Sequence, residues 1–430
     1  METELRILPH QLEVLKSQKR EIFLGGGVGA GKTMIGSLWT LRKAQTAPKE
    51  VYGLIVSNTY SQLYDTTVRA FYKTAEMAGC RLHPSSIPRS KGPNDILLQG
   101  RNGVVRILLR SLEHYERLSG LEIGFAWVDE CWQTVPEAID LLNARLRDKR
   151  MDPNQLLFTT TLDDPSTWMH KRFVEDYAPE FQDVIYARTG DNPNLPETYL
   201  DTLKRTYSDS VFRRMVLSEW VALDESRIYS SFSRAVNVSD NVELQPGIPV
   251  IWTHDFNVAL NKPMSSAVMQ YHQRTDTFCI LDEIIVDGAD THDAIAEFQA
   301  RYSRIDNPII VCGDAAGWSK DTRSRMNDYE IIRRSGFPTI RAPRSNPGVR
   351  DRHNLVNAYC KNARDEVRLL VHPKCKTIIK GMETVHLKKG SSYVEDDSQR
   401  EQHVTSALGY AIWEFTQHKG QVHQIRIGGI

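Results

Sequence analysis

The first half of the chain alternates short apolar runs, typical of buried strands, with a longer segment of helical periodicity. The predicted strands are Ile22–Leu24, Val51–Ser57, Ile123–Val128 and Leu156–Thr161, and the predicted helix covers about Ser61–Ala78. Two more strands, Ile96–Leu98 and Val104–Leu109, flank Arg101-Asn102-Gly103, which indicates a hairpin. Strands that alternate with helices predict an α/β fold with a mostly parallel sheet.

The pattern changes after a helical stretch from about Glu197 to Trp220. Pro246-Gly247-Ile248-Pro249 interrupts the chain and indicates a boundary. Three strands, a helix and a fourth strand follow: Val250–Phe256, Ser265–His272, Phe278–Val286, Thr291–Arg304 and Ile309–Gly313. This order matches a ribonuclease-H-like (resolvase-like) core, and a last helix covers about Ser398–Thr416. We therefore predict two domains, residues 1–222 and 249–430, joined by a linker over residues 223–248.

Composition adds little to this prediction of fold and domains. The 430 residues, 40% of them hydrophobic, are enough for two full cores. The 54 basic and 54 acidic residues balance, which neither supports nor excludes a nucleic-acid partner. The six scattered cysteines form no CxxC pair, so we expect reduced thiols and no structural zinc site. No long apolar run or signal peptide is evident, and we expect an intracellular protein without a membrane partner.

A glycine-rich loop follows the first predicted strand and precedes an apolar helix. It has the pattern GxxxxGKT and predicts a nucleotide-binding loop formed by Gly26, Gly27, Val28, Gly29, Ala30, Gly31, Lys32 and Thr33. The glycines let backbone N–H groups surround phosphates, and the helix adds the positive end of its dipole. We expect Lys32 to reach the β- and γ-phosphates and Thr33 to ligate Mg²⁺.

The strand Ile123–Val128 ends in Asp129-Glu130, the carboxylates that ATP hydrolysis requires. Asp129 is predicted to lie near Mg²⁺ and Glu130 to orient the attacking water. Gln11 is a candidate for the adenine edge, because its amide both donates and accepts hydrogen bonds. Arg117, just before this strand, is the candidate arginine finger, and the Thr159 region could sense the γ-phosphate. Ordinary surface or strand positions remain the alternatives for these last three.

The order of these motifs resembles the ATPase of phage terminase large subunits. It runs from Leu8-Pro9-His10-Gln11 through the glycine loop, a hairpin and Arg117-Leu118-Ser119-Gly120 to Asp129-Glu130. Superfamily 2 helicases are similar in the glycine loop and in the paired acids. A helicase would carry a second ATPase-like lobe, and the second half of this chain has acids at strand ends instead.

Two aspartates end apolar strands of the second half. Asp255 follows the first strand and Asp314 the fourth, and these strands are neighbours in a ribonuclease-H-like core. Adjacent carboxylates repel each other unless divalent metals lie between them. Two metals would activate water and stabilise the leaving oxygen of a cleaved phosphodiester. Asp255 and Asp314 are therefore predicted ligands of Mg²⁺ or Mn²⁺, and Glu283 is a candidate accessory acid.

A third acid is expected near the last helix. Ser398 and Glu401 are spaced as a capping box, and the buried stripe Val404, Leu408, Ala411 extends back through Glu401 to Asp397. Asp397 is the predicted ligand, and Asp396, Glu401 and a supporting His403 stay open as alternatives. The stretch His403–Ala411 resembles the HxxDALxYA pattern of terminase nucleases, except that Ser406 stands where an acid is frequent.

The resemblance covers most of the chain, from Leu8 to about Ala411. It implies an ATP-driven motor that moves double-stranded DNA into a procapsid, fused to a metal-dependent endonuclease. It also implies a ring, most simply a pentamer, on the portal protein, a small terminase subunit as partner, and action in the host cytoplasm. A helicase or repair ATPase with a fused nuclease is the alternative, and a non-catalytic protein of the capsid vertex is the third reading. DNA phosphates could contact arginines between Asp314 and the next helix (Arg323, Arg325, Arg333, Arg334, Arg341, Arg344, Arg350 and Arg352) or a basic hairpin over Lys388–Tyr393.

Overall fold

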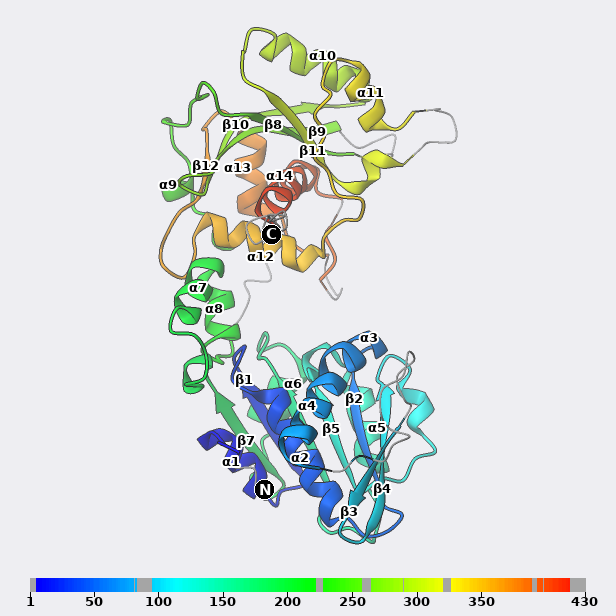
Figure 1. Ribbon diagram of the computed structural model, residues 1–430. Coiled ribbons are helices and arrows are strands. Elements are labelled where there is room, and N and C mark those ends of the chain that lie inside the picture. Colours follow the sequence, from blue (N-terminus) through cyan, green and yellow to red (C-terminus); the bar gives the residue numbers. More distant parts are fainter. Residues whose placement is uncertain are drawn as a thin grey trace, which may run out of the picture. The chain divides into compact units, whose positions relative to one another are not determined.

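The computed structural model describes residues 5–80, 82, 95–221, 227–256, 264–288, 290–319, 326–388, 393–396 and 398–417. The chain divides into two compact units, each shown in Figure 1. Unit 1 contains Met1–Asp201 and Val211–Ala222, and unit 2 contains Thr202–Ser210 and Leu223–Ile430. None of the helices in the described part of the chain has the length and apolar character needed to cross a membrane.

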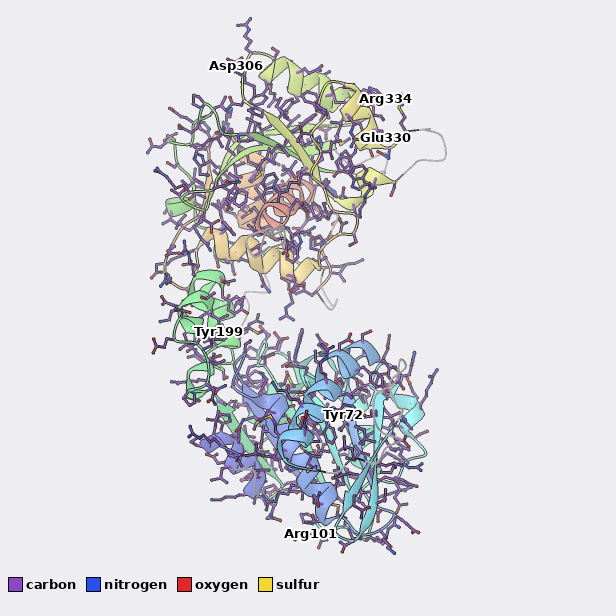
Figure 2. All side chains as sticks on the ribbon, viewed as in Figure 1. Tyr72, Arg101, Tyr199, Asp306, Glu330 and Arg334 are labelled. Atoms are coloured by element: carbon purple, nitrogen blue, oxygen red, sulfur yellow. The ribbon has the colours of Figure 1, made fainter. Side chains whose placement is uncertain are left out.

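Unit 1 is built on a seven-stranded sheet within the described residues, with the order β3-β4-β2-β5-β6-β1-β7. The strands are β1 (Glu21–Gly26), β2 (Tyr52–Ser57), β3 (Asp95–Gly100), β4 (Gly103–Ser111), β5 (Phe125–Asp129), β6 (Gln155–Thr160) and β7 (Gln182–Ala187). Only β3 and β4 pair antiparallel, as the predicted hairpin, and Arg101 lies in its turn (Figure 2). Every other pairing is parallel, which confirms the predicted sheet type.

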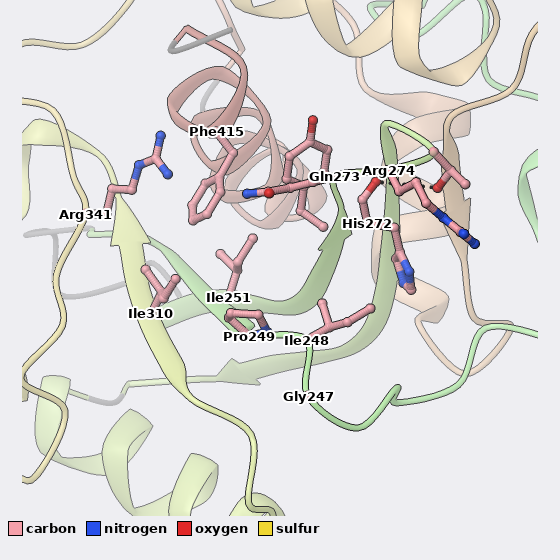
Figure 3. Close-up of a pocket in the computed structure, with 12 residues that line it drawn as sticks. Gly247, Ile248, Pro249, Ile251, His272, Gln273, Arg274, Ile310, Arg341 and Phe415 are labelled. Atoms are coloured by element: carbon pink, nitrogen blue, oxygen red, sulfur yellow. Dashed lines mark hydrogen bonds between the residues drawn. The ribbon is translucent and has the colours of Figure 1, made fainter. Parts of the chain in front are cut away.

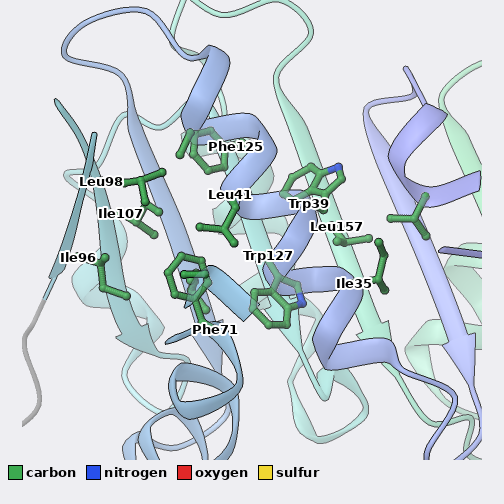
Figure 4. Packing of buried hydrophobic residues seen from close by; sticks show 14 of the residues in the cluster. Ile35, Trp39, Leu41, Phe71, Ile96, Leu98, Ile107, Phe125, Trp127 and Leu157 are labelled. Atoms are coloured by element: carbon green, nitrogen blue, oxygen red, sulfur yellow. The ribbon is translucent and has the colours of Figure 1, made fainter. Parts of the chain in front are cut away.

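Helices cover both faces of this sheet. The helices of unit 1 are α1 (Pro9–Lys16), α2 (Lys32–Thr46), α3 (Tyr60–Gln62), α4 (Arg69–Met77), α5 (Pro136–Arg145) and α6 (Trp168–His170). Two more helices, α7 (Tyr199–Thr206) and α8 (Asp209–Met215), have residues in both units. One buried cluster joins α2 and α4 to the sheet, and Figure 4 shows Ile35, Phe71 and Trp127 in it. Gly36 lets α2 approach Trp127 closely, because a Cβ there would lie 2.1 Å from the indole.

Unit 2 contains a five-stranded sheet within the described residues, ordered β11-β8-β9-β10-β12. The strands are β8 (Val250–Asp255), β9 (Met264–His272), β10 (Thr277–Val286), β11 (Ile309–Gly313) and β12 (Leu369–Val371). The first three are antiparallel neighbours, and β11 runs parallel to β8. This arrangement confirms the ribonuclease-H-like order and places the carboxyl ends of β8 and β11 side by side.

Successive residues of β8 point alternately into two hydrophobic cores, one on each face of the sheet. Trp252 packs with α10 (Thr291–Tyr302) and α11 (Asp328–Arg334). Ile251 faces the cluster that contains residues of α12 (Val349–Cys360), α13 (Lys376–Thr384) and α14 (Arg400–Thr416). Figure 1 shows these two helical layers on opposite faces of the sheet. Asp255 shares the face of Ile251 and therefore points toward α14.

Three features differ from the sequence-based expectations. Residues 223–248, predicted as a linker, contribute Tyr229 and Phe232 to the core of unit 2 and contain α9 (Arg234–Asn237). The expected helical stretch over about 197–220 is two helices, α7 and α8, and residues between them belong to unit 2. Strand β7 was not expected, because its residues at the sheet edge mix polar and apolar side chains without a clear period.

Candidate active sites

The glycine-rich loop of unit 1 joins β1 to α2 with the geometry expected of a phosphate-binding loop. Gly29 and Gly31 have φ of 78° and 85°, values that a side chain disfavours. Helix α2 begins at Lys32, so its first-turn N–H groups have no acceptor within the helix and point toward the loop. The ammonium of Lys32 is buried and donates to the carbonyls of Gly26 (2.8 Å) and Gly27 (3.0 Å).

The segment after β7 supports this loop from outside. Thr189 donates its hydroxyl to the Val28 carbonyl (2.8 Å), and Asn192 donates its amide to the Gly29 carbonyl (2.7 Å). A Cβ on Gly27 would lie 2.7 Å from the Val216 carbonyl, so only glycine fits there. Thr189 and Asn192 were missed because nothing in the local sequence shows that they lie beside the loop.

Gln11 is buried against the same loop. Its Nε2 donates to the Gly31 carbonyl (3.2 Å), and its Oε1 accepts from the backbone of Leu8 (3.0 Å). A Cβ on Gly31 would lie 2.5 Å from this amide. Gln11 therefore holds the start of α2 in place, and a role in reading adenine remains a prediction.

Asp129 and Glu130 lie at the carboxyl end of β5, as expected. Glu130 has φ of 53°, an uncommon conformation for a residue with a side chain and one that concentrates at functional sites. Asp129 is fully buried, and burial together with the Glu130 charge raises its pKa from 3.8 to about 6. Burial lowers the pKa of Lys32, while Glu130 and Asp129 oppose that shift, so all three charges lie close together.

Hydroxyl groups hold both oxygens of the Asp129 carboxylate. Thr159 donates to Oδ1 (2.7 Å) and Thr67 donates to Oδ2 (2.8 Å). The predicted Thr159 thus contacts the acid directly, while its role as a γ-phosphate sensor stays a prediction. Thr67 was missed, because it lies in a helical segment after β2 that reads as ordinary amphipathic helix.

Arg117 lies on an exposed 3₁₀ turn, Tyr115–Leu118. Among the described residues, its guanidinium makes no hydrogen bond or ion pair with the glycine loop or with Asp129 and Glu130. Its role as an arginine finger remains a prediction.

The two predicted carboxylates of unit 2 are brought together at the ends of β8 and β11. His254 pairs with Gly313 across these parallel strands, so Asp255 and Asp314 are the next residues on each. Both are buried, with 8% and 5% exposure. Burial and the Asp255 charge raise the pKa of Asp314 from 3.8 to about 7, although the amides of Phe256, Ala316 and Gly317 oppose this shift.

Helix α14 brings His403 to this pair. Its Nδ1 lies 2.9 Å from Oδ2 of Asp255, and the ring is 4% exposed. Asp397 lies outside the described residues. Among its alternatives, Asp396 accepts from Ser398 (2.6 Å) and Glu401 pairs with Lys380 (2.5 Å). The predicted capping box is wrong, because α14 begins at Arg400 and its N-cap is Gln399.

A partly buried acid that was not predicted lies beside Ser406. Ser406 donates to Oε1 of Glu395 (3.0 Å), which also binds Arg352 (2.5 Å) and His353 (3.0 Å). Burial favours a raised Glu395 pKa, but the His353 hydrogen bond and the Arg352 charge outweigh it and lower the pKa. Tyr410 interacts electrostatically with Glu395 and also with Asp255 and Asp314, so all three acids lie near the same tyrosine.

Other candidates have structural partners. Glu283 caps α13, since its carboxylate accepts the N–H groups of Thr377 (2.9 Å) and Ile378 (2.8 Å). Arg341 lies over Phe415, Arg344 over Trp318, and Arg352 is buried. Arg323 and Arg325 lie outside the described residues. The arms of the basic hairpin pair through Leu387 and Glu395, and its residues 389–392 are likewise outside the description.

A cavity of about 530 Å³ in unit 2 is lined by residues other than Asp255, Asp314 and His403. Figure 3 shows Ile251, Ile310, Arg341 and Phe415 around it. Ile251 and Ile310 occupy the amino-terminal ends of the parallel strands β8 and β11. The cavity is therefore at the opposite end of the sheet from Asp255 and Asp314, and size alone does not identify the chemical site.

The two sites differ in what they can hold. The loop of unit 1 offers backbone donors, a buried cation and carboxylates, which fits a nucleotide with a divalent cation. Asp255 and Asp314 offer hard oxygen ligands in a shared buried position, the donor type that Mg²⁺ and Mn²⁺ prefer. Within the described residues no cluster of three potential metal ligands occurs.

The sequence of the first half of the chain matches a model of a known protein family. Residues 23–235 match the family model "Terminase large subunit, T4likevirus-type, N-terminal". This range includes the glycine loop, Asp129-Glu130 and both α7 and α8. No curated protein matches the sequence.

Solved structures share the fold of both units. The large terminase of a thermophilic bacteriophage aligns with a TM-score of 0.66 at 15% identity, over 95% of this chain and 98% of that chain. The complex of that terminase with ADP gives 0.67 at 16% identity over 94% and 98%. Its complex with ATP-γ-S gives 0.63 at 17% identity over 95% and 98%. At these identities the similarity concerns the fold.

Proposed function

The chain belongs to the large terminase subunits of tailed bacteriophages, and on this premise we propose that it packages viral DNA with an ATPase in unit 1 and cuts it with an endonuclease in unit 2. The observation that carries the proposal is the presence of two separate acidic sites in one chain. One lies beside a phosphate-binding loop and the other at the ends of neighbouring strands in a ribonuclease-H-like sheet. A helicase would need a second ATPase lobe where this sheet stands.

In unit 1 the loop binds the phosphates of ATP. Lys32 exchanges its contacts with the Gly26 and Gly27 carbonyls for phosphate oxygens. Thr33 and Asp129 would hold Mg²⁺, which neutralises phosphate charge when bound. Glu130 orients the attacking water from its position just after β5, where its backbone is left-handed. Thr159 would report the state of the site to the sheet, and its hydrogen bond to Asp129 supports this role.

The ATPase is tested with two variants of the full chain. Lys32→Ala removes the phosphate cation and is expected to abolish nucleotide binding. Glu130→Gln keeps the size and hydrogen-bonding of the side chain but removes the base, so it binds ATP and loses at least about 100-fold in turnover. Normal phosphate release by Glu130→Gln would exclude the assigned role.

In unit 2 Asp255 and Asp314 would hold divalent cations, which activate water and stabilise the leaving oxygen of a phosphodiester when bound. His403 fixes the orientation of Asp255 through the 2.9 Å contact. Asp397 remains the predicted third ligand. Plasmid cleavage by Asp255→Asn is expected to fall to background while ATP hydrolysis persists. Cleavage at the wild-type rate would exclude unit 2 as the nuclease.

Family membership supports double-stranded DNA as the substrate and a ring, most simply a pentamer, on the portal vertex with the small subunit as partner. Translocation then takes place in the host cytoplasm. Arg117 is the residue of this chain that we assign to the ring contact, since it is exposed and outside its own site. Arg117→Ala and Lys32→Ala subunits would each be inactive alone. Partial ATPase activity on mixing them supports a finger in trans, and the absence of any recovery contradicts it.

A further inference from the structure

A chain of hydroxyl hydrogen bonds surrounds Asp129 from two sides. Thr67 donates to Oδ2 of Asp129, and its oxygen lies 3.0 Å from that of Ser57 at the end of β2. Because the single hydroxyl proton of Thr67 goes to the carboxylate, Ser57 is the donor in the second bond. On the other side Trp127 donates to Thr159 (2.7 Å), which donates to Oδ1. Each hydroxyl is therefore fixed by a partner behind it.

Thr67 reaches this position through an irregular turn. The segment Leu63–Val68 is π-helical and lies between α3 and α4. A π-turn inserts one residue and so changes the phase of the helix by roughly 100°, which redirects the side chains around it. Thr67 is fully buried, while its neighbour Thr66 is exposed and donates to the Gln62 carbonyl (2.5 Å). The two adjacent threonines thus have opposite environments.

The arrangement matters because Asp129 has few other constraints. The only hydrogen bonds described for its carboxylate come from the two threonines, one to each oxygen. Removing either one frees the carboxylate to rotate about its side-chain torsions. Groups that orient a metal ligand in this way commonly change metal affinity about 10–100-fold when they are lost.

We propose that Thr67 is a positioning residue of the Mg²⁺·ATP site, which fixes the Asp129 carboxylate and joins the π-helical segment Leu63–Val68 to the metal position. The inference rests on the proposed ATPase function. The π-helical segment Leu63–Val68 would then control the metal position, because a movement of its last turn would reorient the Asp129 carboxylate without changing the nucleotide-binding loop.

The test measures how much Mg²⁺ strengthens binding of ATP-γ-S to the full chain. The dissociation constant is determined with Mg²⁺ and with EDTA for wild type, Thr67→Val, Thr67→Ser and Thr66→Val. Valine keeps the shape of threonine and removes the hydroxyl, serine keeps the hydroxyl, and Thr66→Val is a matched control one residue away. Ser57→Ala is measured too, because it removes the hydroxyl that donates to Thr67 and so weakens the hydrogen bond from Thr67 to Asp129.

We expect Thr67→Val to lose about 10-fold of the Mg²⁺ enhancement with an unchanged constant in EDTA, and to need about 10-fold more Mg²⁺ for half-maximal ATP hydrolysis. Thr67→Ser and Thr66→Val should resemble wild type, and Ser57→Ala should show a smaller loss in the same direction. An undiminished enhancement in Thr67→Val, or an equal loss in EDTA, overturns the inference. If Thr67→Val does not fold, an unchanged enhancement in Ser57→Ala overturns it. Failure of wild type to bind or hydrolyse ATP would instead refute the proposed function.

Discussion

The buried His254 predicts a specific loss of stability in acid. It lies in β8 with its ring 4.3 Å from Trp252 and stacked 4.9 Å from Phe256. Neither ring nitrogen has a hydrogen-bond partner among the described residues, and the side chain is fully buried. Burial lowers its pKa from 6.5 to about 3, because a charged ring would be desolvated without compensation.

The sign follows from proton binding. Below pH 6.5 the unfolded chain takes up a proton at this residue that the folded chain does not, so stability falls as the pH drops toward 3. With these two pKa values the loss between pH 7 and pH 5 is about 2 kcal/mol. For a unit of this size that corresponds to a decrease in Tm of roughly 4–8 °C.

The perturbation is His254→Phe, which keeps an aromatic ring between the two aromatic neighbours and cannot be protonated. Calorimetry of the full chain at pH 7 and pH 5 gives the change in Tm, and the transition of unit 2 is identified as the one that ATP-γ-S does not raise. We expect the decrease in Tm between pH 7 and pH 5 to be roughly 4–8 °C smaller in the variant than in wild type. The exposed His292→Phe is the control. Equal pH dependence in His254→Phe and wild type would refute the reasoning.

Three further outcomes are expected. Gly27→Ala should abolish nucleotide binding in a titration while unit 2 melts normally, because its Cβ would meet the Val216 carbonyl at 2.7 Å; retained binding contradicts the loop geometry. Glu283→Ala should lower the stability of unit 2 by about 1 kcal/mol in urea unfolding through loss of the α13 cap and leave plasmid cleavage intact, whereas loss of cleavage alone would restore it as an accessory acid. Glu395→Ala should cost about 3 kcal/mol, because Arg352 is left buried without its partner, and a double variant with Arg352→Met should recover part of this; strict additivity would show that the pair is not coupled.

Much of the fold could be predicted from periodicity. Strands with continuous apolar runs, such as β2 and β11, were located to within a residue or two, because burial on both faces requires such runs. The edge strand β7 was missed, since an edge position tolerates polar residues such as Gln182 and Asp183. The end of the first predicted domain at residue 222 coincides with the end of unit 1, but residues 223–248 belong to unit 2. The break at Pro246–Pro249 suggested a linker there, whereas membership of a core depends on long-range contacts of Tyr229 and Phe232.

The residues of the candidate sites also fall into those that local sequence indicates and those that it does not. The positions of predicted residues at strand ends and in the glycine loop could be anticipated, because local sequence determines both. Thr67 and Asn192 reach the nucleotide site from distant segments through hydrogen bonds, and Glu395 reaches Ser406 from just before α14; no local pattern records such contacts. Ser406 appeared only as a departure from a family pattern, and its bond to Glu395 shows that an acid approaches this position from another part of the chain.

The central claim is that one chain carries two independent active sites, and the most direct test measures both activities in the same preparations. Wild type, Lys32→Ala and Asp314→Asn are assayed for ATP hydrolysis and for cleavage of supercoiled plasmid in Mg²⁺ or Mn²⁺, with EDTA as the blank. The account predicts that Lys32→Ala cuts DNA without hydrolysing ATP and that Asp314→Asn hydrolyses ATP without cutting DNA. Metal-dependent cutting that survives in Asp314→Asn, or the loss of both activities in each folded variant, would contradict it.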